Sequence, residues 1–210
     1  MTDLSSQNNT GNAGRPSRAF TAVLEYAELF VICLAAILLI FSFFVSVCNV
    51  DGASMNPTLE NGELLLVSDR FYTPEQGDIV VFHQTGLTGP TAHLNKPIIK
   101  RIIATEGQHV VIDFAARRIV VDGVELKEDY IQLINAHGAD INQYTIYAQH
   151  NMVNGVFDAI VPEGHLFVMG DNRNNSTDSR SAAIGFVDER CVLGRVLCRI
   201  FPFSAMGTVD

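Results

Sequence analysis

A serine on a short, stiff segment is the first residue of this sequence that could act as a nucleophile. Ser54 lies in Gly52-Ala53-Ser54-Met55-Asn56-Pro57-Thr58-Leu59, just after a long apolar run ends. The segment is rich in small residues, and Pro57 has a fixed φ angle, so the backbone there is restrained. A serine hydroxyl needs a neighbouring base before it attacks a carbonyl carbon. Because serines in loops are common, Ser54 becomes a candidate only if the chain supplies such a base.

A lysine between isoleucines is the candidate base. Lys100 lies in Pro97-Ile98-Ile99-Lys100-Arg101-Ile102-Ile103. In an extended strand it shares one face with Ile98 and Ile102. If that face points inward, desolvation lowers the lysine pKa, and a neutral lysine can accept a serine proton. The stretch alone is also compatible with an ordinary lysine that reaches the surface or forms an ion pair.

A long polar loop contains the remaining candidates. Its sequence is Gly170-Asp171-Asn172-Arg173-Asn174-Asn175-Ser176-Thr177-Asp178-Ser179-Arg180. A calcium loop of the EF-hand type needs an oxygen ligand at its third position and glycine at its sixth, where this loop has Arg173 and Ser176. The alternation of aspartate and arginine instead indicates an ion-paired, hydrogen-bonded loop that holds a hydroxyl group in place. By composition alone, the stretch is also compatible with a solvated turn.

Strand patterns surround these candidates. Turn signals at Asn61-Gly62 and Gln76-Gly77-Asp78 precede apolar runs, and Asp122-Gly123 between two such runs is typical of a two-residue hairpin. We expect strands at 64–67, 79–82, 98–104, 110–114, 118–121, 124–126, 166–169 and 192–201. The sequence therefore predicts a mainly β, antiparallel domain over residues 51–210. Residues from about 112 to 162 are expected to be an inserted elaboration that contributes none of the chemistry.

The apolar run before Ser54 predicts a membrane anchor. Residues 29–50 contain no charged side chain, and about 20 apolar residues cross a hydrocarbon core of roughly 30 Å. The run is longer than the core of a cleaved signal peptide. We therefore expect one uncleaved transmembrane helix within residues 19–50, with residues 19–28 as an amphipathic first part. Residues 1–18 are polar and are expected to form a disordered tail.

The distribution of basic residues predicts the orientation of this anchor. Arg15 and Arg18 precede the span, and the next basic residue after it is Arg70. Cytoplasmic flanks of membrane spans carry the excess of lysine and arginine. The tail should therefore be cytoplasmic, and the β domain should lie outside the plasma membrane.

Composition excludes several other classes of protein. The net charge of −9 argues against a nucleic-acid-binding protein. The charged fraction is 18% and the hydrophobic fraction 48%, as expected for a chain partly in lipid. There is no CxxC motif, and the histidines lack the spacing of metal ligands, so we expect no metal or other cofactor. Cys191 and Cys198 are expected to be free thiols, although a bridge between them stays open.

Together and in this order, these stretches resemble bacterial type I signal peptidases, membrane-bound serine endopeptidases that remove signal peptides from exported proteins. The matching residues are Ser54-Met55-x-Pro57-Thr58-Leu59, Gly77-Asp78-Ile79-Val80-Val81-Phe82, Lys100-Arg101 and Gly170-Asp171-Asn172-Arg173-x-x-Ser176-x-Asp178-Ser179-Arg180. The resemblance covers about residues 29–201, and its last motif is the most specific. It implies an antiparallel β-sheet catalytic domain of the signal peptidase/LexA type behind one N-terminal transmembrane helix. The single span and short C-terminal end resemble the Gram-positive-like form.

The resemblance implies a Ser–Lys dyad. Ser54 would be the nucleophile and Lys100 the general base, a variant of the serine triad. Met55 would pack beside the nucleophile, and the Ser54 N–H would donate to the oxyanion. Some members have a serine as a second oxyanion donor where this chain has Gly52, as in the Gram-positive-like branch, so the identity of the second donor in this region stays open.

The resemblance also implies supporting roles for the polar loop. Ser176 would orient the lysine. Asp178 and Arg180 would form an ion pair near it, and Asp171 and Arg173 would shape the loop. The turn Glu106-Gly107-Gln108 stands where members often have Pro-Gly-Asp, a difference that concerns the turn more than the chemistry.

The implied partners are preproteins and the lipid bilayer. The resemblance implies substrates with small residues, often alanine, at positions −1 and −3 before the cleaved bond. An extended peptide bound beside a strand edge suits a β domain. A membrane anchor would confine enzyme and substrate to one plane and raise their effective concentration.

Two other functions remain open on the sequence. A self-cleaving repressor of the LexA type has a similar dyad and fold, but it carries a DNA-binding domain where this chain has an apolar span. A non-catalytic, membrane-anchored extracytoplasmic module would also have an anchor and a β domain, and it would not need the ordered Ser, Lys and Asp/Arg motifs.

Overall fold

The computed structural model of the chain describes residues 18–68, 70, 72–86, 92, 94–131, 152–153 and 155–209. It divides the chain into two compact units, Met1–Phe43 and Phe44–Asp210. The predicted disordered tail, residues 1–18, lies outside the described residues apart from Arg18. Residues 132–151, in the middle of the predicted elaboration, also lie outside them.

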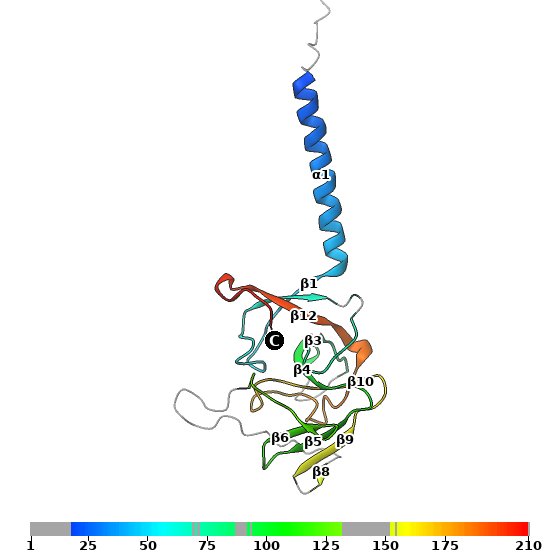
Figure 1. Ribbon diagram of the computed structural model, residues 1–210, viewed down its shortest axis with the longest axis vertical. Helices are drawn as coiled ribbons and strands as arrows, with labels where there is room; N and C mark the ends of the chain where they lie inside the picture. Colours follow the sequence, from blue (N-terminus) through cyan, green and yellow to red (C-terminus); the bar gives the residue numbers. More distant parts are fainter. Residues whose placement is uncertain are drawn as a thin grey trace, which may run out of the picture. The chain divides into compact units, whose positions relative to one another are not determined.

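The first unit contains a single long helix, α1 (Arg18–Phe44; Figure 1). Its stretch Thr21–Phe44 is 24 residues long and has a mean hydropathy of 2.6. At 1.5 Å per residue this stretch is about 36 Å long, which is enough to cross a hydrocarbon core of about 30 Å. By length and composition, α1 can therefore span a membrane.

The predicted end of the anchor at Val50 is wrong. The helix ends at Phe44, and the next residues form the strand β1 (Ser46–Asn49). β1 pairs residue by residue with β2 (Leu64–Ser68), from Ser46 opposite Val67 to Asn49 opposite Leu64. Composition could not show this boundary, because Val47 and Cys48 are apolar whether they lie in a helix or in a strand. The pairing partner, which lies beyond Ser54, decides it.

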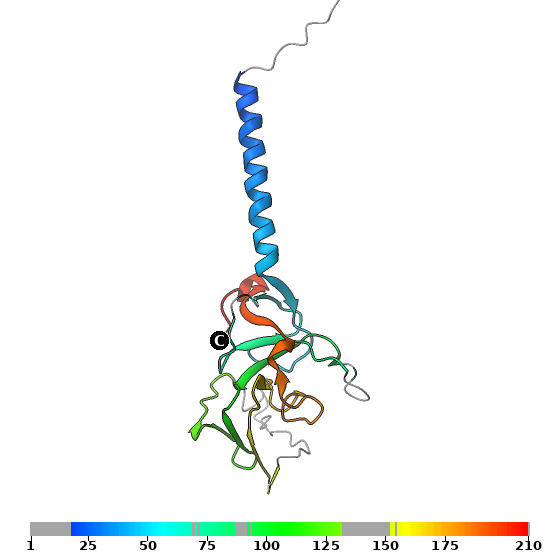
Figure 2. The same cartoon turned by 90° about the vertical axis from the view of Figure 1, so that its right-hand side faces the viewer.

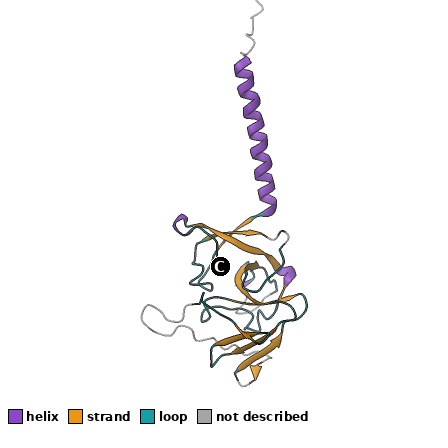
Figure 3. Cartoon of the chain, in the orientation of Figure 1, coloured by secondary structure: helices purple, strands orange, loops and turns teal. Residues whose placement is uncertain are grey.

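The second unit is built from antiparallel strands, with two short 3₁₀ turns, η2 (Glu189–Cys191) and η3 (Phe203–Ala205), among its described residues (Figure 3). The further strands are β3 (Ile79–Phe82), β4 (Ile98–Ala104), β5 (His109–Asp113), β6 (Arg118–Val121), β7 (Val124–Glu125), β8 (Met152–Val153), β9 (Val156–Ile160), β10 (His165–Met169), β11 (Val187–Asp188) and β12 (Val192–Phe201). The predicted mainly β, antiparallel fold is confirmed. The predicted segments correspond to β2–β7, β10 and β12, whereas β1, β8, β9 and β11 were not predicted.

The strands form two sheets, which gather in separate groups in Figures 1 and 2. The larger sheet has the order β1-β2-β12-β3-β4-β10-β11, and the smaller sheet has the order β7-β6-β5-β9-β8. In the larger sheet, β4 lies between β3 and β10 and pairs with both. This inner position gives β4 neighbours along both of its edges.

Both faces of β4 are covered, and all seven of its residues are buried. Ile98 and Ile102 belong to one buried apolar cluster, and Ile99 and Ile103 belong to two others. The face that carries Lys100 is therefore an interior, apolar face. The opposite face is interior as well, which the alternation of residues did not predict.

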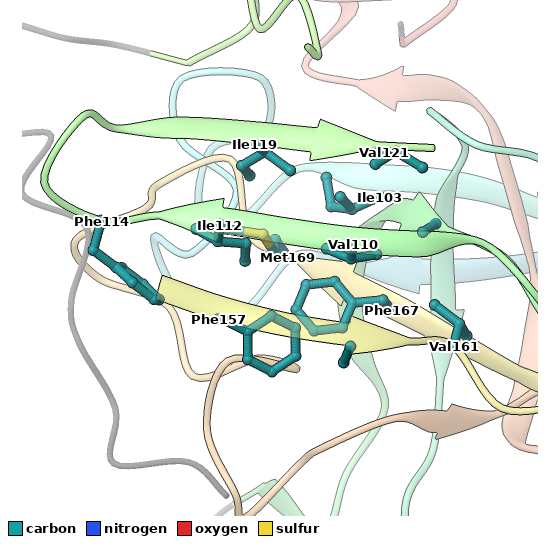
Figure 4. Close-up of a cluster of buried hydrophobic side chains, with 12 residues drawn as sticks. Ile103, Val110, Ile112, Phe114, Ile119, Val121, Phe157, Val161, Phe167 and Met169 are labelled. Carbon is teal, nitrogen blue, oxygen red and sulfur yellow. The ribbon is translucent and has the colours of Figure 1, made fainter. Parts of the chain in front are cut away.

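The smaller sheet shares a core with the larger one (Figure 4). Phe157 of β9 and Phe167 of β10 have ring centroids 5.2 Å apart, and Met169 and Ile103 belong to the same cluster. β9 was not predicted, because Val156–Ile160 alternates buried with exposed residues over only five positions. Its register with all of β5 makes the segment after residue 112 a part of the common core.

This shared core gives a stability prediction. Phe157→Ala should lower the free energy of unfolding by about 3–5 kcal/mol, because a buried ring is lost and a cavity remains. Ile160→Ala, on the same strand at a side chain that is 65% exposed, should change it by about 0.5 kcal/mol or less. Urea unfolding of the full chain in detergent, followed by circular dichroism, measures both. Equal losses in the two variants would contradict the shared core.

Candidate active site

Ser54 lies on the turn between β1 and β2 and is held there by its neighbours. Met55 and Leu59 are almost completely buried in the apolar cluster beneath the turn. The Leu59 N–H donates to the Met55 carbonyl at 2.9 Å, and the Asn56 N–H donates to the Ala53 carbonyl at 3.2 Å. The two apolar side chains fix the turn from below. Ser54 itself is half-buried and lines an open cleft.

The side chain of Lys100 reaches Ser54 from β4. Its Nζ donates to Ser54 Oγ at 2.8 Å and to the Ile99 carbonyl at 2.8 Å. Lys100 is only 3% exposed. Burial lowers its pKa from 10.5 to about 8, against the opposing charges of Asp178 and Asp171. The structure thus brings together the two residues that the sequence predicted as a dyad.

The polar loop holds the backbone of the nucleophile turn. The Asn172 N–H donates to the Ser54 carbonyl, and Asn172 Nδ2 donates to the Ala53 carbonyl, both at 3.0 Å. The loop approaches so closely that a Cβ atom on Gly170 would lie 2.4 Å from the Ser54 carbonyl oxygen and 2.3 Å from Ser176 Oγ. A residue with a side chain therefore does not fit at position 170.

Asp178 and Arg180 form the expected ion pair. Arg180 Nε donates to Asp178 Oδ1 and Nη2 donates to Oδ2, each at 2.8 Å, with both side chains fully buried. Burial alone would raise the pKa of Asp178. The charge and hydrogen bonds of Arg180, the Gly170 N–H and the Ser176 hydroxyl outweigh burial and lower it. Asp178 thus stays ionised, and Ser176 is buried within the same loop.

Asp171 and Arg173 do not pair with each other. Arg101 holds Asp171 in a bidentate pair, with Nε donating to Oδ1 at 3.0 Å and Nη2 donating to Oδ2 at 2.8 Å. Arg173 is fully buried and forms its ion pair with Glu128. The loop is therefore tied to β4 on one side and to the segment after β7 on the other.

Residues 112–162 were expected to contribute none of the chemistry, and two of them contact arginines that support the site. Glu128 pairs with Arg173, and the ring of Tyr130 lies under the Arg101 guanidinium, 4.0 Å from its carbon to the ring centroid. Sequence reasoning missed both residues. Their only signal was an acidic and an aromatic residue in an otherwise unpatterned segment.

The backbone amides near Ser54 differ in their availability to an oxyanion. Within the part of the chain that the structure describes, the Ser54 N–H donates to no protein acceptor. The Gly52 N–H donates to Asn61 Oδ1 at 2.8 Å, and Gly52 has a φ of +106°, which favours glycine. The Gly52 amide is therefore already occupied.

A cleft of about 390 Å³ opens beside the dyad. Its walls are the segments 49–55 and 96–100, with contributions from Leu94, Asn175 and Thr177. Both long walls are stretches of chain that lead into or out of strands. All four cysteines are free thiols; Cys191 and Cys198, for which this was expected, are half-buried.

Comparison with known proteins gives the family. Residues 23–201 match the family model of signal peptidase, peptidase S26. The chain belongs to this family. It is 35% identical over 189 residues to the probable signal peptidase I-1 of Synechocystis sp., covering 88% of this chain and 86% of that protein. It is 29% identical over 196 residues to signal peptidase IB of Staphylococcus aureus strain COL, covering 87% and 91%.

A solved structure is also similar. The crystal structure of a signal peptidase I from Enterococcus faecalis V583 is 31% identical and covers 59% of this chain and 97% of that one, with a TM-score of 0.41. The family makes this enzyme a serine endopeptidase that removes signal peptides from preproteins, and the apolar helix α1 fits membrane anchoring. The LexA-type repressor and the non-catalytic module are set aside.

The close approach at Gly170 gives a prediction. Gly170→Ala should lower kcat about 100-fold, because the new methyl group must displace the Ser54 carbonyl, and a shift of about 1 Å can cost that much. Gly207→Ala is the matched control, since a Cβ there meets nothing within 4 Å. Steady-state cleavage of a preprotein measures both. Full activity of Gly170→Ala would show that the turn does not depend on this contact.

Proposed function

We propose that this enzyme cleaves signal peptides with Ser54 as nucleophile and Lys100 as general base. The observation that supports this most is the 2.8 Å contact between Lys100 Nζ and Ser54 Oγ at a buried lysine. Neutral Lys100 takes the proton of Ser54 as Oγ attacks the carbonyl carbon of the scissile peptide. The ammonium then protonates the leaving amine, and an acyl ester on Ser54 remains. Neutral Lys100 next deprotonates the water that hydrolyses this ester.

The Ser54 N–H supports the oxyanion in this proposal. Its availability suits it to donate to the carbonyl oxygen as negative charge develops there, a contribution worth several kcal/mol in other enzymes. The loop supplies the supporting roles. Ser176, in the loop that the Asp178–Arg180 ion pair organises, keeps Lys100 oriented, while Asp171 and Arg173 keep the loop in shape. A direct action of Ser176 on the lysine stays a prediction.

The proposed substrate segment is an extended peptide in the cleft. Segments 49–55 and 96–100 line its two sides, and an extended peptide bound beside a strand edge suits a β domain. Val50, Ala53 and Ile98 among the lining residues suit small apolar side chains. This supports a preference for small residues at positions −1 and −3 of the signal peptide.

The lipid bilayer is the proposed partner of α1. Large apolar side chains are exposed along the helix, including Leu29, Phe30 and Leu38. Such a surface is costly in water and favourable in lipid. The positions of Arg15, Arg18 and Arg70 support a cytoplasmic N-terminus and a catalytic unit outside the plasma membrane.

Variants of the dyad test the proposed function. Ser54→Ala and Lys100→Met should each lower kcat at least about 1,000-fold, because the nucleophile or its base is lost. The assay incubates the full chain in detergent with a secretory preprotein, and N-terminal sequencing of the product locates the cut. Thermal unfolding confirms that each variant is folded. Activity retained in either folded variant would rule out the dyad.

The lysine pKa sets the pH dependence. Because only neutral Lys100 acts as base, kcat should rise with pH and level off above a midpoint of about 8. Below that midpoint it should fall about tenfold per pH unit. A stopped-assay profile between pH 5.5 and pH 10 measures this. A kcat that stayed constant down to pH 6 would contradict a neutral lysine base.

A further inference from the structure

We propose that Tyr130, assisted by Glu128, is a positioning residue for the dyad. Tyr130 contacts both Arg101 and Arg173. Through these two arginines it restrains the polar loop, which donates a hydrogen bond to the Ser54 carbonyl. The inference rests on the proposed roles of Ser54 and Lys100 and adds a part of the chain that carries none of the sequence motifs.

The guanidinium group of Arg101 has hydrogen-bond partners along its edges and an aromatic ring over one face. Its edge N–H groups hold Asp171 and also donate to the Gly77 carbonyl, at 2.8 Å from Nη1. The Tyr130 ring covers a face of the guanidinium at 4.0 Å, and Arg101 is only 3% exposed. A guanidinium over an aromatic ring is attracted more strongly when water is excluded. Tyr130 therefore fixes the plane in which Arg101 presents its N–H groups to Asp171.

Arg173 touches the same tyrosine from the polar loop. Its Nη2 pairs with Glu128 and lies 3.4 Å from the Tyr130 hydroxyl, and its guanidinium lies 5.9 Å from the Tyr130 ring centroid. Its Nε donates to the Gly170 carbonyl at 3.1 Å. Tyr130 thus lies between an arginine of β4 and an arginine of the loop. Its ring contacts both guanidinium groups.

The polar loop that the two arginines restrain makes hydrogen bonds to both ends of the nucleophile turn, Ser54 to Thr58. Asp171, held by Arg101, accepts a hydrogen bond from Thr58 Oγ1 at 2.5 Å. The next loop residue, Asn172, donates to the Ser54 carbonyl. The turn from Ser54 to Thr58 is therefore fixed at its start and at its end by neighbouring loop residues. A shift of the backbone at Asp171 and Asn172 would move both contacts.

The same contacts affect the charge state of Lys100. Asp171 and Asp178 raise the pKa of Lys100, whereas burial and Arg180 lower it. Loss of the Tyr130 ring would weaken the hold of Arg101 on Asp171. A less neutralised Asp171 carboxylate would raise the pKa of Lys100 further. Burial raises the pKa of Tyr130 itself to about 12, so the ring stays neutral between pH 6 and pH 10.

A tyrosine that only fills space would have different effects. Removing it would lower stability and the folded fraction, but the folded molecules would keep the wild-type pH profile. A positioning role predicts a change in kcat and in its pH midpoint with little change in KM. The two roles are therefore separable by kinetics on folded protein.

The test compares Tyr130→Phe, Tyr130→Leu and Glu128→Gln in the full chain, with Phe157→Leu as a destabilised control in the core of the smaller sheet. Tyr130→Phe keeps the ring and should stay within about threefold of wild-type kcat. Tyr130→Leu should lower kcat about 10- to 100-fold, leave KM within about twofold and move the pH midpoint of kcat upward from about 8. Glu128→Gln should lower kcat by a smaller factor, about 3- to 10-fold. Phe157→Leu should lower the melting temperature without moving the midpoint.

Several outcomes would overturn the inference. One is a Tyr130→Leu enzyme whose kcat per folded molecule and pH midpoint match those of Phe157→Leu. If Tyr130→Leu does not fold, Tyr130→Met is tested instead. The expected changes in kcat, KM and the pH midpoint are the same. Failure of both to fold, beside a fully active Tyr130→Phe, would assign Tyr130 to folding alone. Activity retained in Ser54→Ala or Lys100→Met would refute the dyad itself, whereas loss there with unaffected Tyr130 variants would refute only the present inference.

Discussion

The burial of Lys100 is the constraint on which the rest of the site depends. An ammonium group on an interior strand face is unfavourable, because desolvation penalises the charged form. Lys100 is desolvated because its strand, β4, lies between β3 and β10 and has apolar clusters on both of its faces. The same burial lowers the pKa of Lys100 to about 8, so that a much larger fraction of its amine is neutral near that pH than for an exposed lysine. In the proposed dyad, the 2.8 Å contact with Ser54 Oγ supplies the proton that this amine accepts.

The buried carboxylates of Asp171 and Asp178 raise the pKa of Lys100 and so oppose the effect of burial. The arginine paired with each carboxylate limits this increase. An unpaired carboxylate within a few ångströms can raise a lysine pKa by about one to three units. Asp171 and Asp178 are each held by a bidentate arginine, Arg101 and Arg180. Each pair has no net charge, so its field at Lys100 is weaker than that of a bare carboxylate. Arg180 lowers the pKa of Lys100 and offsets part of the effect of Asp178, while both carboxylates organise the loop.

The sequence predicted the parts of this arrangement that are local. The strand at β4, the hairpin after β6 and the pairing of Asp178 with Arg180 depend on residues close together in the chain. The errors concern contacts between distant segments. The helix ends at Phe44 because β2 pairs with the residues that follow. Tyr130 belongs to the site because Arg101 reaches it, and no local pattern marks that contact.

The choice of ion-pair partners explains why the site needs both sheets. Had Asp171 paired with its near neighbour Arg173, the polar loop would have been a self-contained turn. Instead the two residues pair with Arg101 of β4 and with Glu128, which follows the smaller sheet's β7. The loop is thereby cross-linked to two separate parts of the catalytic unit. Its shape, and so its grip on the Ser54 backbone, exists only when both parts are folded. Active-site assembly is thus coupled to the fold of the whole unit, including the segment whose sequence carries none of the catalytic motifs.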